Sequence, residues 1–227
     1  MEKAKVAVYY GKKAITGEKV VFALKKVKIP FSMITAEDIG GGRLDEFKAV
    51  IFPGGHSIVL NSKEKRNFFD FIRNGGGVVG ICAGAQFGYL NRLLPVEHKI
   101  FRATGIFDMR IVKKHPITKG YVVAPKSKNR RNWRYSPKGR VRIRYENGGL
   151  FSVKGKVDML VSFDEKNMFG AVVAGKYGKG KVVLIAPHPE STPPGKVLRW
   201  SQKRGYYESR LQEPLKLFGN AVRYVLK

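Results

Sequence analysis

The segment that most constrains the fold of this chain is Gly80-Ile81-Cys82-Ala83-Gly84. It follows the apolar run Gly77–Ile81 and precedes a helix-forming stretch, so it has the Gly-x-nucleophile-x-Gly form of a strand-turn-helix elbow. Bulky residues at either glycine would collide with the adjacent strand or helix. The turn places the Cys82 thiol at the carboxyl end of a sheet, and the helix N-terminus behind it favours the thiolate. The segment therefore predicts an α/β fold with a reactive cysteine.

Short apolar runs alternate with helical or loop segments along the chain, which is typical of parallel strands covered by helices. Strands are expected at Lys5–Tyr10, Ala49–Phe52, Gly77–Ile81 and Lys181–Ala186. Helices are expected over Lys63–Asn74, Ala83–Leu94 and, closing the chain, Glu208–Leu226. No composition shift marks a linker, so a single domain is expected over residues 1–227, with its core at about 5–190.

The second half of the chain has a different pattern. From Phe101 to Ala174, short apolar segments are separated by turn residues such as those of Tyr145-Glu146-Asn147-Gly148-Gly149, in which Asn-Gly favours a tight turn. Gly170–Lys176 and Lys181–Ala186 flank Tyr177-Gly178-Lys179-Gly180 and predict a hairpin. The expected architecture is a doubly wound sheet with a β-rich excursion in its second half.

A nucleophilic thiol needs a base, and His188 is the candidate among four histidines. It follows the last apolar run, so its side chain is expected at the carboxyl edge of the sheet, near Cys82. Glu190 lies two residues further and points the same way in an extended backbone, where it can orient the imidazole. The alternative is a surface His-Pro turn with a solvated glutamate. His98 and His115 have no acidic residue two positions further along the chain, as His188 has, and are expected to be structural.

Backbone N–H groups that could stabilise an oxyanion are expected near the same edge. Gly54 and Gly55 follow the run Ala49–Phe52 and leave their N–H groups exposed, alongside the N–H of Ala83. The alternative for the paired glycines is an ordinary tight turn. His56 is a candidate for substrate binding at the mouth of the crevice, with a capping or solvent-facing role as its alternative.

The formal net charge is +27, large enough to attract polyanions. Lys126–Arg144 holds nine basic residues and no acid, interleaved with Trp133 and Tyr135. This pattern suits nucleic acid or an acidic protein partner, and its alternative is a solvated basic loop and edge strand.

A lone cysteine, no signal peptide and no apolar run of membrane-span length indicate a cytoplasmic protein without membrane contact. One cysteine and scattered histidines predict no metal, and no cofactor is expected.

Gly80-Ile81-Cys82-Ala83-Gly84-Ala85-Gln86 resembles the G-x-C-x-G-x-Q elbow of class I glutamine amidotransferases, and His188-Pro189-Glu190 resembles their terminal H-P-E. The resemblance implies a flavodoxin-like three-layer sandwich with a mostly parallel sheet. It also implies a Cys82, His188 and Glu190 triad acting on a small-molecule amide, and it makes Gln86 a second substrate-binding candidate.

The chain also resembles a branch of that superfamily, the biotin-protein ligase N-terminal domain-like proteins. Their G-I-C-A-G-A elbow, Y-x-N-G-G turn and G-K-G…H-P-E ending are similar to Gly80–Ala85, Tyr145–Gly149 and Gly178–Glu190. The adenylate loop and lysine of biotin ligases are absent, so no biotin ligation is expected.

Three functions follow from these patterns. The first is a cysteine-dependent amide hydrolase or glutamine amidotransferase-like enzyme that uses the triad. The second is a non-catalytic module that binds nucleic acid or an acidic partner through Lys126–Arg144. The third is a cysteine peptidase on the same scaffold.

Overall fold

The computed structural model describes residues 5–11, 17–55, 58–124, 139–164, 166–191 and 212–227. Within these residues, one mixed sheet runs in the order β2-β1-β3-β4-β11-β10-β9-β6-β7. Its first five strands are parallel to one another. They are β2 (Phe31–Ile34), β1 (Val6–Tyr9), β3 (Ala49–Phe52), β4 (Gly77–Ile81) and β11 (Gly180–Ile185).

The remaining strands pair antiparallel and form the β-rich second half that the turn pattern predicts. They are β10 (Gly170–Tyr177), β9 (Asp158–Ser162), β6 (Thr104–Ile111) and β7 (Arg140–Glu146), with β5 (Val96–Ile100) and β8 (Gly149–Val153) branching from β10. The hairpin of β10 and β11 is confirmed, with Tyr177 opposite Gly180. It joins the antiparallel part of the sheet to the parallel part.

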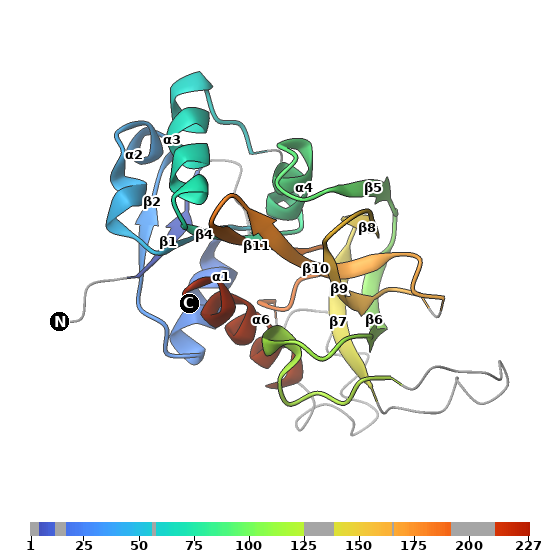
Figure 1. Ribbon diagram of the computed structural model, residues 1–227. Coiled ribbons are helices and arrows are strands. Elements are labelled where there is room, and N and C mark those ends of the chain that lie inside the picture. Colours follow the sequence, from blue (N-terminus) through green and yellow to red (C-terminus); the bar gives the residue numbers. More distant parts are fainter. Residues whose placement is uncertain (1–4, 12–16, 56–57, 125–138, 165, 192–211) are drawn as a thin grey trace, which may run out of the picture.

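Helices cover both faces of the parallel strands. Figure 1 shows α1 and α6 on one side of the sheet and α2, α3 and α4 on the other. Their bounds are α1 (Gly17–Lys26), α2 (Ala36–Gly40), α3 (Ser62–Arg73), α4 (Ala83–Leu90) and α6 (Gln212–Val225), with 3-10 turns η1 (Arg43–Glu46) and η2 (Pro116–Thr118). The expected α/β class, a three-layer fold, is confirmed.

Aromatic side chains in the core pack the flanking helices against the end of β3, next to the elbow. Phe52 at the end of β3 packs against Tyr9, Phe68 of α3 and Phe87 of α4, with ring centroids 5.2, 5.2 and 4.8 Å apart. α3 begins at a capping box in which Asn61 and Glu64 satisfy each other's backbone N–H groups. These contacts fix the helices that flank the carboxyl ends of β3 and β4.

The expectation for the helix after the elbow was wrong at its end. α4 stops at Leu90, and not at Leu94, because Arg92 adopts a left-handed conformation with φ 54°. Leu93 and Leu94 are then buried at 1% and 3% exposure as the chain turns toward β5. Burial of two leucines outweighs continuation of the helix.

Two expectations fall partly outside the described residues. The closing helix is present from Gln212, while 208–211 are not described. Of the basic segment Lys126–Arg144, residues 126–138 lie outside the described part, including Trp133 and Tyr135. None of the described helices combines the length and apolar composition needed to cross a membrane.

Candidate active site

Cys82 occupies the elbow between β4 and α4. Its backbone has φ 49° and ψ −109°, a conformation that L residues rarely adopt, and its N–H donates to the Ile185 carbonyl at 2.8 Å. A Cβ at Gly80 would lie 2.4 Å from the Gly84 carbonyl oxygen, and one at Gly84 would lie 2.0 Å from that of Phe52. The two glycines therefore let the turn close against β3, and the strained backbone projects the thiol from the sheet edge.

His188 and Glu190 lie just beyond β11, the strand beside β4. Register pairs Ile81 with Ile185, so the residues that follow the two strands emerge at the same edge. The Nδ1 atom of His188 is 2.8 Å from Oε1 of Glu190, and the two residues are 3% and 1% exposed. The pair is therefore a buried, hydrogen-bonded imidazole and carboxylate, with the orientation that the i and i+2 spacing predicts.

The electrostatics of this pair favour the imidazolium. Burial lowers the pKa of His188, but the charge of Glu190, interaction with the Cys82 side chain and the hydrogen bond to Glu190 together raise that pKa to about 10. Glu190 thus holds the proton on Nδ1 and directs Nε2 toward the side of the ring away from itself.

Cys82 interacts with His188, but the geometric hydrogen bond of its thiol is made elsewhere. The thiol donates to the Glu146 carbonyl oxygen, 3.8 Å from Sγ. Nε2 of His188 has no hydrogen-bond partner among the described residues. Thiol–imidazole pairs that are open in a free protein can close when a substrate is bound. The structure therefore places Cys82, His188 and Glu190 at one site. The hydrogen bond between His188 and Glu190 is formed, while the Cys82 thiol is hydrogen-bonded to Glu146.

The oxyanion candidates lie against the start of α4. The Gly84 N–H donates to the Pro53 carbonyl at 3.1 Å, which places the Gly54–Gly55 turn beside the elbow. Gly55 has φ 140°, and the N–H groups of Gly54, Gly55 and Ala83 form no hydrogen bond to another described residue. Within the described part of the chain these donors are therefore available, and Ala83 directly follows the cysteine.

The remaining sequence candidates are the substrate-binding candidates Gln86 and His56 and the two histidines expected to be structural. Gln86 lies on α4, where its N–H donates to the Cys82 carbonyl at 2.9 Å and its side chain is partly buried. His56 lies outside the described residues. His115 caps η2 through Nδ1, and His98 stacks on Tyr89 with centroids 4.9 Å apart, so both have structural contacts.

Sequence reasoning missed the contribution of β7, whose last residues reach the site. Tyr145 is buried and hydrogen-bonds the carbonyls of Phe101 and Gly148, while burial and the Cys82 charge raise its pKa. Glu146 contacts Cys82 through its carbonyl and lies near His188 through its carboxylate. The only signal was Tyr145–Gly149, which indicated a turn but not where that turn would lie.

Neither a protein-family model nor a curated protein sequence matches the chain. Similarity to solved structures is extensive at low sequence identity. PurLQS from Thermotoga maritima shares 16% identity at TM-score 0.69, over 98% of this chain and 99% of that one. A GMP synthase subunit protein from Thermoplasma acidophilum shares 13% at 0.64, over 98% and 94%. A glutamine amidotransferase from T. maritima shares 14% at 0.56, over all of both chains.

The chain has a glutamine amidotransferase-like fold. The similarity extends over the whole length, so it includes the antiparallel half as well as the parallel strands. Identity is too low to carry over an activity, because one fold hosts many functions. The chemistry of this chain therefore depends on the side chains at the edge of β4 and β11. Among the described residues, no group of three or more side chains suited to a metal ion occurs.

The His188 pKa predicts a specific dependence of stability on pH. The pKa in the folded protein is about 10 against an ordinary 6.5, so the folded state binds this proton more tightly than the unfolded chain. The stabilisation is complete below about pH 6.5 and is lost as pH rises through about 10. In urea denaturation, we expect the difference in unfolding free energy between wild type and His188→Asn to shrink from pH 6 to pH 10. A difference that stays constant over this range contradicts the assignment.

Proposed function

We propose that the protein is a cysteine-dependent amide hydrolase of the glutamine amidotransferase-like type. The observation that carries the proposal is the buried His188–Glu190 pair beside a cysteine in a strained elbow, at the carboxyl edge of two adjacent parallel strands. A nucleophile beside an imidazole that a carboxylate orients is an arrangement that covalent catalysis uses. The elbow and H-P-E motifs also support placing the chain in the biotin-protein ligase N-terminal domain-like branch.

The geometry supports a two-step reaction. In the first step, the Cys82 thiolate attacks the amide carbonyl carbon, the S–C bond forms and the C–N bond breaks. The imidazolium of His188 gives its proton to the departing nitrogen, so the amine leaves neutral. In the second step, water gives a proton to His188 and its oxygen to the carbonyl carbon, which releases the acid and the thiolate.

Two further groups have roles in this proposal. Glu190 keeps the His188 ring in one orientation and stabilises its charged form. The N–H groups of Gly54, Gly55 and Ala83 would bind the oxyanion, since they form no other hydrogen bond among the described residues. His56 and Gln86 stay candidates for substrate binding.

The proposal is tested by covalent labelling. We expect a glutamine-like electrophile to form one adduct, located at Cys82 by mass spectrometry, and we expect His188→Asn to slow its formation strongly. Cys82 is the only cysteine in the chain, so the adduct count is unambiguous. His115→Asn is a matched control, because asparagine can also cap η2 and His115 lies outside the site.

The outcomes separate the candidate functions. No selective labelling of Cys82, or labelling equal in wild type and His188→Asn, would overturn the hydrolase. Turnover of peptides without turnover of glutamine would identify a cysteine peptidase on the same scaffold.

The alternative function, binding of nucleic acid or an acidic partner through Lys126–Arg144, has less support from the described part of that segment. Arg142 donates two hydrogen bonds to the Asp108 carboxylate, each 2.8 Å long, and Arg144 pairs with Glu146. These arginines are therefore matched by carboxylates within the sheet. The amide hydrolase is the function that we propose.

A further inference from the structure

Glu146, the last residue of β7, contacts both members of the proposed Cys82–His188 pair. Its carbonyl oxygen accepts the Cys82 thiol hydrogen bond, 3.8 Å from Sγ. Its carboxylate oxygen Oε2 lies 3.9 Å from Nε2 of His188. A thiol, an imidazole nitrogen and a carboxylate oxygen therefore converge from three different elements of the fold.

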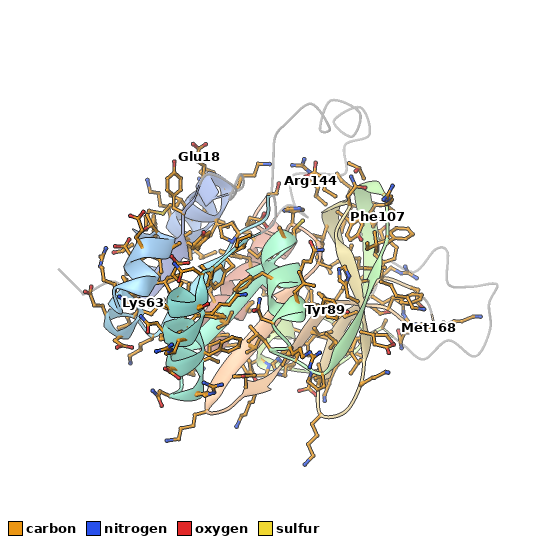
Figure 2. All side chains as sticks on the ribbon, turned by 90° about the horizontal axis from the view of Figure 1, so that it is seen from above. Glu18, Lys63, Tyr89, Phe107, Arg144 and Met168 are labelled. Carbon is orange, nitrogen blue, oxygen red and sulfur yellow. The ribbon has the colours of Figure 1, made fainter. Side chains whose placement is uncertain are left out.

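An ion pair with Arg144 holds the carboxylate of Glu146 in place. Arg144, labelled in Figure 2, pairs with the other carboxylate oxygen, Oε1, and donates a 3.0 Å hydrogen bond to the Ser191 hydroxyl. The Arg144 carbonyl accepts the His188 backbone N–H at 2.7 Å. The same residue thus ties β7 to the segment that carries His188.

This arrangement leaves Oε2 as an available acceptor. It forms no hydrogen bond to another described residue, and the Glu146 side chain is 34% exposed, so a bound ligand can reach it. Nε2 of His188 also has no hydrogen-bond partner in the described part of the chain, but this atom is buried, so a ligand can contact it only if neighbouring side chains at the site move. The two atoms lie 3.9 Å apart and form an ion pair when the imidazole is protonated.

One nitrogen atom can bind to both of these groups at once. Hydrogen bonds of this kind are about 2.9 Å long, so an atom at that distance from both Nε2 and Oε2 fits a separation of 3.9 Å. The nitrogen that leaves an amide receives a proton from Nε2 and still carries an N–H to donate to Oε2. The oxygen that leaves an ester has no such hydrogen, and its lone pairs are repelled by a carboxylate.

We propose that Glu146 is a specificity-determining residue that binds the leaving nitrogen and makes the site prefer primary amides to esters of the same acid. This rests on the proposed function. In the acylation step, the S–C bond forms and the C–N bond breaks. The proton on Nε2 moves to the nitrogen, and Oε2 accepts an N–H from the departing ammonia.

The test compares one amide and one ester that share an acyl group, with glutamine and the γ-methyl ester of glutamate as probes. In Glu146→Gln we expect kcat/KM for the amide to fall about tenfold or more, because a hydrogen bond to a charged acceptor is replaced by one to a neutral acceptor. The value for the ester is expected to stay within about twofold. A merely structural role would lower both values together.

The control is Asp108→Asn, which removes a carboxylate from a comparable arginine pair on β6 and β7, away from His188. It is expected to leave both values unchanged. Equal losses on amide and ester in Glu146→Gln, or an unchanged ratio, would overturn the role of Glu146 while leaving the hydrolase intact. A wild-type protein that hydrolyses neither probe would overturn the proposed function and this inference with it.

Discussion

His188→Asn is expected to lower the rate of amide hydrolysis by about 10²- to 10⁴-fold, the range in which a positioned acid–base group contributes. Asparagine cannot take up and return the proton that the leaving nitrogen requires. Initial rates of ammonia release from glutamine measure the effect, with the fold checked by circular dichroism. A loss smaller than about tenfold would show that His188 is not the base.

Glu190→Gln is the companion variant for this prediction. The amide removes the negative charge that favours the imidazolium and can present an N–H to Nδ1, which selects the wrong tautomer of His188. A loss similar to that of His188→Asn is therefore expected. His115→Asn should retain wild-type rates, because His115 contacts η2 and Tyr224 and not the site.

Gly84→Ala is expected to lower the free energy of unfolding by about 3 kcal/mol, at the upper end of the usual cost of overpacking. The new Cβ would lie 2.0 Å from the carbonyl oxygen and 2.6 Å from the carbonyl carbon of Phe52. Both are backbone atoms, so relief requires α4 to move away from β3. Urea denaturation at neutral pH measures the change.

The matched control for Gly84 is Gly17→Ala in α1. Among the described residues, a Cβ there would meet only a Tyr10 side-chain atom at 3.7 Å, an ordinary contact. Alanine also favours the helix, so we expect a change within about 1 kcal/mol, toward stabilisation. A Gly84→Ala variant as stable as Gly17→Ala would show that the elbow does not need its glycine.

The parallel core could be predicted from the sequence because local signals were strong there. Ala49–Phe52 and Gly77–Ile81 are continuous apolar runs with turn residues beyond them, and both strands were predicted to the residue. The edge strand β2 was not predicted, because Phe31–Ile34 is short and mostly not buried. Arg92 ended α4 early because tertiary burial of the leucines that follow overrides helix propensity.

The candidate site was predictable only where its residues share a local pattern. Cys82 sits in an elbow motif, and His188 and Glu190 are two residues apart after a strand. Glu146 was not predictable, because its approach to Cys82 depends on the pairing of β7 with β6 and on the turn at Asn147. Such contacts between residues far apart in the sequence leave no periodic signal.

The thioester that Cys82 forms with the acyl group of an amide in the proposed reaction can be trapped during turnover. Wild-type protein is mixed with glutamine, quenched in acid during turnover and analysed by intact-protein and peptide mass spectrometry. We expect an adduct on Cys82 equal in mass to the substrate minus ammonia, absent from Cys82→Ser. Ammonia release that continues undiminished in Cys82→Ser, with no adduct on the wild-type protein, would contradict the proposed reaction.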